Sequence, residues 1–353
     1  MKLSVFPAGD GDCLLLSYSQ GPEKYVLIDG GRKGAYRTLS PRLREIAAGG
    51  GRIEAMVLTH IDADHIEGLL AMIEDEPYIP VDEVWFNGFE QLSTVRAQGP
   101  GQGDKFSAAL KSRRIEINAR FGHSAIVVPD LGGLSAVQLP GGLNITVISP
   151  DRRRLDDLQT SWSKWRDREA EEAVVAKAPK VSELEVFGRK PMPEIIDVEK
   201  LAAGIEHVDD EVPNGSSIAF VAEFGGKRVL FGADAHPDLI LANIERVKAR
   251  MPDFAIDLYK VSHHGSIGNT TRALAEALDC GRFVISSNGA RHGHPDPEAI
   301  AKLVKHGKSG PKELFFNYMS ERTSPWNDQG LCRKWNYTCR IPSSAGAPLE
   351  IDV

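Results

Sequence analysis

The chain has 353 residues, of which 42% are hydrophobic and 26% charged, an ordinary globular composition that excludes disorder over most of its length. Its net charge of -7 disfavours broad, sequence-independent phosphate binding, although a local basic patch or bound metal ions can still hold a polyanion. The length exceeds that of most single domains, and we expect one large α/β domain with insertions.

The N-terminal segment and the cysteines indicate the compartment. Acidic Asp10 and Asp12 follow the start of the chain closely, so we expect no signal-peptide core, and no apolar run has the length to span a bilayer. The cysteines are few and scattered, which fits a reduced compartment. For Cys332 and Cys339 we favour two unpaired structural thiols over pairing or metal binding. These features predict a cytoplasmic protein without a membrane partner.

Strands and helices alternate in the first part of the predicted fold. Strands are expected at residues 3–6, 13–18, 25–28, 55–59, 81–86, 126–128 and 143–148, and helices at 37–48, 66–73 and 105–120. The turn between the first two strands is Gly9-Asp10-Gly11-Asp12. The composition changes at residues 151–208, which we interpret as an inserted, partly helical excursion.

Strand patterning returns after this excursion. Strands at 217–224 and 228–231 flank Gly225-Gly226, a strong signal for a two-residue hairpin. Further strands are expected at 258–261 and 283–286, helices at 237–248, 271–278 and 298–306, and a strand-rich tail at 314–342. This order is typical of open α/β sheets, in which the loops after strands carry the chemistry.

A dense run of potential metal ligands, His60, Asp62, Asp64 and His65, follows the apolar strand at 55–59. Imidazole nitrogens and carboxylate oxygens both suit zinc, and carboxylates also suit manganese. The alternative is a solvated acidic loop whose histidines cap the next helix. The density of ligands favours a metal site.

Residues 59–68 resemble the signature of the metallo-β-lactamase superfamily, with Asp62 at the position of the usual second histidine. This variant is similar to the ComEC-type competence proteins and their soluble relatives. Further matching segments are Gly9-Asp10-Gly11-Asp12 and residues 27–31, 214–218, 231–234, 260–266 and 293–295. The resemblance implies an αββα sandwich of two mixed β-sheets flanked by helices. It places a hydrolase domain at 1–307, with an insertion at about 151–208, and leaves 308–353 as a strand-rich C-terminal extension.

Carried over residue by residue, the resemblance implies two divalent metal ions per chain, Zn2+ or Mn2+. The first is held by His60 and Asp62, the second by Asp64, His65 and His264, and Asp234 bridges the two. A carboxylate between two cations offsets their repulsion, and a water shared by them becomes hydroxide near neutral pH. Without the resemblance, Asp234 would be interpreted as a turn-capping aspartate.

Only one of the adjacent His263 and His264 is expected to bind metal, because neighbouring side chains on an extended chain point in opposite directions. We assign that role to His264, which directly precedes a glycine as the final ligand does in many superfamily members. His263 is then a contact to substrate or to the ligands. Where lactamase-like relatives supply a further histidine, this chain has Asn214, and nearby His207 is expected on the surface. The first metal is therefore expected to be underligated, weakly held, or completed by a residue that the sequence does not place.

Other polar residues complete the candidate site. His294 is a candidate proton donor or anion contact, with a structural turn histidine as the alternative, and it joins Asp64 and His263 as the candidate catalytic set. Ser266, Asn269 and Asn214 are candidate substrate contacts, although the first two can instead cap the helix at 271. Asp29 is expected to hydrogen-bond the ligand loops.

These features predict a binuclear metal-dependent phosphodiesterase or nuclease, because hard carboxylate ligands suit phosphate chemistry. The alternatives are a hydrolase of a small ester, lactone or thioester, and a catalytically weak metal-binding regulatory module. Basic and aromatic side chains alternate in the tail and are candidates for binding single-stranded nucleic acid. We slightly favour the alternative, an edge hairpin with solvated charges and half-buried aromatics. These basic and aromatic residues are Arg322, Trp326, Arg333, Lys334, Trp335, Tyr337 and Arg340.

Overall fold

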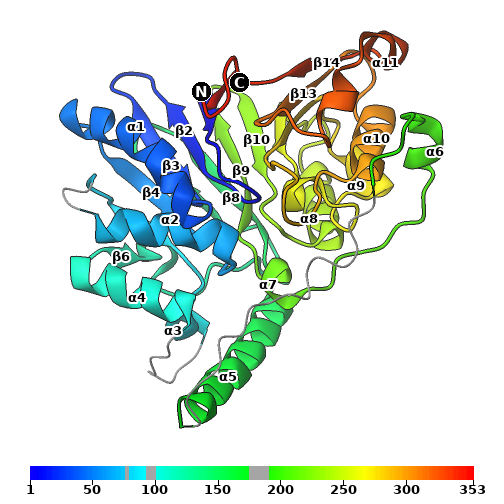
Figure 1. Ribbon diagram of the computed structural model, residues 1–353. Coiled ribbons are helices and arrows are strands. Elements are labelled where there is room, and N and C mark those ends of the chain that lie inside the picture. Colours follow the sequence, from blue (N-terminus) through cyan, green and yellow to red (C-terminus); the bar gives the residue numbers. More distant parts are fainter. Residues whose placement is uncertain (76–78, 93–100, 175–190) are drawn as a thin grey trace.

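Two β-sheets face each other at the centre of the molecule, and helices cover the outer face of each sheet (Figure 1). The computed structural model describes residues 1–75, 79–92, 101–174 and 191–353. Its layers are those of the αββα sandwich with two mixed sheets that the sequence predicts. Of the excursion expected at 151–208, residues 175–190 lie outside the described part.

The first sheet has, in the described chain, seven strands in the order β15-β1-β2-β3-β4-β5-β6. Pairing is antiparallel from β15 to β3 and parallel from β3 to β6. The strands are β1 (Lys2–Val5), β2 (Leu14–Tyr18), β3 (Lys24–Ile28), β4 (Ile53–Val57), β5 (Glu83–Trp85), β6 (Glu116–Ile117) and β15 (Leu349–Asp352).

The second sheet has, over the same part of the chain, eight strands in the order β14-β13-β12-β11-β10-β9-β8-β7. Its strands from β10 to β14 run parallel, so their C-terminal ends lie at one edge. They are β7 (Ala136–Gln138), β8 (Asn144–Ser149), β9 (Ala219–Phe224), β10 (Lys227–Phe231), β11 (Leu258–Lys260), β12 (Arg282–Ile285), β13 (Lys312–Phe316) and β14 (Tyr337–Arg340). The predicted hairpin joins β9 to β10, and Gly225 and Gly226 both have positive φ, as its turn requires.

Helices pack their apolar faces on the outer side of each sheet. The first sheet is covered by α1 (Tyr36–Ala48), α2 (Ala63–Glu74), α3 (Phe89–Leu92) and α4 (Gln102–Arg113), and the second by α8 (Pro237–Lys248), α9 (Arg272–Ala277) and α10 (Pro297–His306). Between the sheets, residues such as Leu16, Val57 and Phe220 are fully buried. Apolar clusters lie between the sheets and beneath the helices on each outer face. Burial of this apolar area is the main force that holds the strand ends in place.

Two predicted elements differ from the structure. The helix expected at 105–120 ends at Arg113, because Arg114 adopts a left-handed conformation that turns the chain into β6. The strand expected at 126–128 is reduced to a single bridge between Val128 and Asp151.

The excursion at 151–208 is partly helical, as expected. It contains α5 (Arg152–Val174) and α6 (Val198–Ala202), and α7 (Val212–Gly215) follows it. Among the described helices, none combines the length and the apolar character needed to cross a membrane.

The tail at 308–353 is built into both sheets. Strands β13 and β14 extend the second sheet and pair parallel, whereas β15 pairs with β1 in the first sheet. Parallel neighbours require a crossover, which here contains α11 (Gln329–Trp335), so the favoured edge hairpin is wrong.

A close backbone contact sets the position of α2. The amide of Gly30 donates to the carbonyl oxygen of His65, and the amide of Gly68 donates to the carbonyl oxygen of Gly31, each at 2.9 Å. A Cβ atom on Gly68 would lie 1.9 Å from the carbonyl oxygen of Gly30. Only glycine permits this approach, which places the first turn of α2, and with it His65, over the loop after β3.

Candidate metal centre

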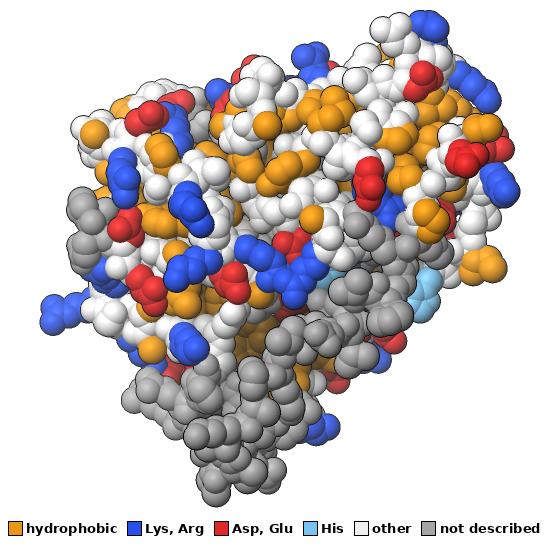
Figure 2. Space-filling model, viewed as in Figure 1, with side chains coloured by type: hydrophobic (Ala, Val, Ile, Leu, Met, Phe, Trp, Pro, Cys, Tyr) orange, Lys and Arg blue, Asp and Glu red, His pale blue; other side chains and the backbone are white. Residues whose placement is uncertain are grey.

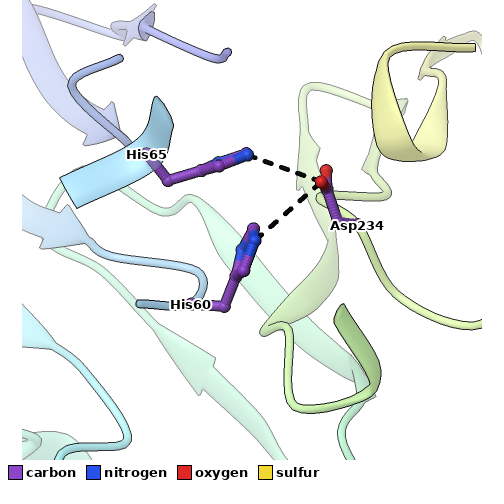
Figure 3. A group of neighbouring side chains, drawn as sticks. All are labelled: His60, His65 and Asp234. Atoms are coloured by element: carbon purple, nitrogen blue, oxygen red, sulfur yellow. Dashed lines mark ion pairs between the residues drawn. The ribbon is translucent and has the colours of Figure 1, made fainter. Parts of the chain in front are cut away.

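Three loops at the ends of strands bring the candidate ligands together between the two sheets. The chain leaves β4 through His60, Asp62 and the first turn of α2, leaves β10 through a turn that holds Asp234, and leaves β11 through the short 3-10 segment η4 (Ser262–Gly265). Figure 3 shows His60 and His65 pointing from the first sheet toward Asp234 on the second. The ligands therefore come from segments about 200 residues apart in the chain and meet only when the sheets pack.

The distances within one set of ligand atoms suit coordination of a shared metal ion. The Nε2 atom of His65 lies 3.7 Å from Asp64 Oδ2 and 3.6 Å from Asp234 Oδ2. The Nε2 atom of His264 lies 3.5 Å from Asp64 Oδ2 and 3.6 Å from Asp234 Oδ2. Ligand atoms around a tetrahedral ion with bonds of about 2.1 Å are separated by roughly 3.4 Å. These four residues are the set predicted for the second metal.

A second group of ligand atoms adjoins the first and shares Asp234. The Nε2 atom of His60 lies 3.6 Å from Asp62 Oδ2 and 3.9 Å from Asp234 Oδ2. Ligand atoms of His60, His65 and Asp234 all lie within 4.8 Å of one another. The Oδ2 atom of Asp234 thus faces both groups, which is the position that a bridging carboxylate needs.

Buried polar atoms without a hydrogen-bond partner mark the same place. Within the described chain they include Nε2 of His60, His65 and His264, and Oδ1 of Asp234. Leaving one such group unsatisfied costs about 1–3 kcal/mol. A divalent cation would satisfy several of them together, so the residues present fit a metal ion.

The other ring nitrogen of each candidate histidine is held by an acceptor. Nδ1 of His65 donates to Asp29 Oδ2 at 2.8 Å, and Nδ1 of His264 donates to the carbonyl oxygen of Ser286 at 2.9 Å. Nδ1 of His60 lies 3.1 Å from the hydroxyl of Thr59, which donates in turn to Asp29. With the proton on Nδ1, each Nε2 keeps its lone pair for a metal. Asp29 therefore has the role predicted for it.

Comparison with known proteins agrees with this geometry. Residues 7–125 match the sequence model of the metallo-beta-lactamase superfamily, and this stretch contains His60, Asp62, Asp64 and His65. Residues 7–125 therefore form part of a metallo-beta-lactamase superfamily domain. The closer resemblance to ComEC-type proteins stays a prediction.

Several solved structures are similar to the chain at low sequence identity. Zinc-bound PqqB from Methylobacterium extorquens is 14% identical, with 100% of both chains covered and a TM-score of 0.43. A diphosphatase of the PhnP family is 12% identical, with 100% of this chain and 97% of the other covered and a TM-score of 0.40. Metallo-beta-lactamase SMB-1 is 14% identical, with 86% and 91% covered and a TM-score of 0.30. No curated protein matches the chain.

Both His263 and His264 face the candidate metal centre, so the expectation that they diverge is wrong. Their φ angles are 46° and 54°, in the left-handed region, and the chain is therefore not extended there. Nε2 of His263 lies 3.7 Å from Asp234 Oδ2, almost the distance found for His264. A pair of left-handed residues in succession is rare outside glycine, and sequence periodicity does not reveal it.

Asp209 is a residue of the site that the sequence interpretation missed. Its carboxylate accepts hydrogen bonds from the side-chain amides of Asn214, at 2.8 Å, and Asn269, at 2.9 Å, and lies 3.3 Å from Nδ1 of His263. The side-chain oxygen of Asn269 also accepts from that Nδ1 at 2.9 Å. Asp209 and the two asparagines therefore orient His263. Asn214 stands where relatives have a histidine, and here it supports one.

The residues predicted to contact substrate mostly form hydrogen bonds within the protein instead. Asn269 is fully buried and Asn214 nearly so, and the amide of Asn269 also donates to the carbonyl oxygens of Asp234 and Ala235. The hydroxyl of Ser266 accepts from the amide of Gly268 at 3.2 Å and holds the turn. We therefore revise the roles of Asn214, Asn269 and Ser266 from substrate contact to positioning of the ligand loops.

His294 lies beside the centre, with its ring centroid 5.2 Å from that of His263. Its Nδ1 atom is 3.4 Å from Asp296 Oδ2. Burial lowers the pKa of His294 despite this contact, so the ring is mainly neutral at neutral pH. A neutral ring disfavours the predicted proton donor and favours hydrogen bonding to an anionic oxygen.

Asp12 is a second residue that the prediction missed. It is buried, its Oδ2 atom pairs with Lys260 Nζ at 2.5 Å, and its Oδ1 atom lies 3.5 Å from Nδ1 of His264. Asp12, Asp234 and His264 form another group with ligand atoms within 4.8 Å. The glycine-rich turn at Gly9 to Asp12 thus contributes a carboxylate beside the second metal group.

The interleaved bases and aromatics of the tail do not form one surface. Arg322 and Trp326 are buried, and Tyr337 is buried beside Trp326, whose carbonyl oxygen accepts from the tyrosine hydroxyl. Arg333 and Arg340 are exposed and line the cavity around Lys312, outside the groups of metal ligands. The predicted strip along the tail is therefore wrong as a continuous nucleic-acid surface.

Metal affinity is expected to rise with pH. Burial lowers the pKa of His264, but Asp234 and Asp12 outweigh burial and raise it to about 10. The same carboxylate effect raises the pKa of His65. A cation must displace protons from these rings, and release of one proton per ion would strengthen binding about 100-fold between pH 6 and pH 8. Calorimetry in buffers of different ionisation enthalpy counts the protons, and binding without proton release would contradict this ligand assignment.

Proposed function

We propose that the protein is a binuclear metal-dependent hydrolase that cleaves phosphodiesters. The observation that supports this most is that the Nε2 atoms of His65 and His264 each lie 3.5 to 3.7 Å from carboxylate oxygens of Asp64 and Asp234, next to a second group that shares Asp234. Paired cations bound there would supply Lewis acidity and lower the pKa of a bound water. The chain contributes a rigid cradle, because each histidine is fixed through Nδ1 and cannot turn away.

The carboxylate content of the site supports phosphate as the group acted on. Asp62, Asp64, Asp234 and Asp12 are hard oxygen donors, which suit the ions that usually serve phosphoryl chemistry. Negative charge on the ligands also balances the cations while leaving them able to attract anionic oxygens.

One arginine side chain lies close enough to the candidate ligands to interact with the charge of Asp64. Arg32 is partly exposed, its Nε and one terminal nitrogen bind Asp10, and its charge interacts with that of Asp64. An arginine held in this way is suited to bind a phosphate oxygen. On the face seen in Figure 2, Lys and Arg side chains are interspersed with acidic ones and form no broad basic surface. Binding of an anionic substrate would therefore depend on the metal ions and a few neighbouring groups.

A substrate panel tests this proposal. The protein is stripped with a chelator, reloaded with Zn2+ or Mn2+, and assayed on bis(p-nitrophenyl) phosphate, single-stranded DNA, a simple ester and a lactone. We expect metal-dependent turnover of the phosphodiester, which the chelator abolishes. Cleavage of single-stranded DNA would extend the proposal to a nuclease. Turnover of the ester or lactone alone would replace the substrate class, and two bound metal ions without any turnover would indicate a binding module.

A further inference from the structure

A cavity lies at the opposite end of the eight-stranded sheet from the metal centre. Its volume is about 990 Å³, and it is lined where parallel strands begin, including Asp257 before β11, Arg282 of β12, Lys312 of β13 and Tyr337 of β14. The metal ligands follow the C-terminal ends of β10 and β11. The cavity and the metal ligands therefore lie toward opposite ends of these parallel strands.

Lys312 in this cavity is buried without a partner for its charge. It is 7% exposed, and it shares one face of β13 with the buried Leu314 and Phe316. No hydrogen bond or ion pair joins its ammonium to another described residue, and burial alone lowers its pKa. Two other buried lysines differ, because Lys260 pairs with Asp12 and Lys302 contacts the carbonyl oxygen of Thr270. The Nζ atom of Lys312 is not sealed from solvent, so it is open to the cavity, where an anion can supply its counter-charge.

The rest of the lining is also basic. Five basic side chains line the cavity against two acidic ones, in a chain whose net charge is -7: Arg282, Lys308, Lys312, Arg333 and Arg340 against Asp257 and Glu313. Both acidic groups are already engaged. Glu313 binds Arg282 at 2.8 Å and Arg340 at 2.9 Å, and Asp257 binds Lys227 at 3.0 Å. None of these carboxylates neutralises Lys312.

We propose that this cavity binds a small organic anion, with its phosphate or carboxylate group on Lys312 and Arg333. The volume exceeds what an inorganic ion needs and matches that of sites for small molecules. Ile256, Pro311 and the thiols of Cys332 and Cys339 line the remainder and offer apolar contact to the body of the ligand. The site does not depend on the function proposed for the metal centre.

Calorimetric titration at constant ionic strength tests the proposal with three probes: inorganic phosphate, citrate and adenosine 5'-monophosphate. We expect at least one probe to bind the metal-loaded parent and to bind Lys312→Met at least about tenfold more weakly, since a hydrogen bond to a charged group is lost. Arg333→Ala changes an exposed residue, so it preserves the fold and should also weaken binding. Lys24→Met, a partly exposed lysine on the other sheet, is the matched control and should bind as the parent does.

A further variant separates this cavity from the metal centre. Asp234→Ala removes the shared carboxylate there and should leave binding of the probe intact. Failure of all three probes to bind the parent would overturn the proposal. Equal binding by the parent, Lys312→Met and Arg333→Ala would also overturn it, as would binding that only Asp234→Ala removes.

Discussion

Asp234→Ala is expected to remove most of the bound metal and to lower kcat/KM for a model phosphodiester by at least about 100-fold. Its Oδ2 atom lies 3.6 to 3.9 Å from the Nε2 atoms of His60, His65 and His264, so the substitution takes one ligand from both groups. Loss of several kcal/mol of charge stabilisation corresponds to a change of this size. Elemental analysis of desalted protein and steady-state kinetics measure the two effects.

The fold of Asp234→Ala should persist, because the apolar layers do not include this carboxylate. Circular dichroism and size-exclusion chromatography check that expectation. Asp238→Ala is the matched control: its carboxylate is exposed, pairs with Arg154 and lies outside the ligand groups. Full metal content in Asp234→Ala would show that the two groups do not share this residue.

His263→Ala is expected to lower the metal content from two ions per chain toward one. Nε2 of His263 is 3.7 Å from Asp234 Oδ2, and its Nδ1 atom is fixed by Asn269, so the ring is oriented as a ligand would be. Elemental analysis of desalted protein counts the ions, and His207→Ala, which changes an exposed histidine, is the control.

The opposite result for His263→Ala has a clear meaning. If the variant keeps two ions and loses only turnover, His263 contacts the substrate, as the sequence alone suggested. If it keeps both ions and full turnover, neither role holds, and the network of Asp209, Asn214 and Asn269 serves the fold alone.

Much of the site is local in sequence and could be predicted. His60, Asp62, Asp64 and His65 lie within six residues, directly after a buried strand that ends at the edge of a sheet. Asp234 and His264 required the ordered resemblance in addition, because each alone has an ordinary structural interpretation. The Gly225-Gly226 hairpin was also predictable, because two glycines between strand patterns are typical of a two-residue turn in which both residues have positive φ.

Contacts between distant segments were decided by the tertiary structure. Asp12 reaches His264, and Asp209 reaches His263, only because packed sheets bring their loops together. The direction of His263 depends on two left-handed φ angles, which follow from how η4 is held and not from residue spacing.

The contacts of the tail were also decided by the tertiary structure. Its alternating bases and aromatics resemble one surface in the sequence, but the crossover through α11 buries Trp326 and turns Arg333 and Arg340 toward the cavity around Lys312. Local sequence determines which strands, turns and ligand types the chain contains, because short-range sterics and side-chain chemistry act within a few residues. Strand order and loop conformation determine which of them meet, because those contacts form only when the apolar layers pack.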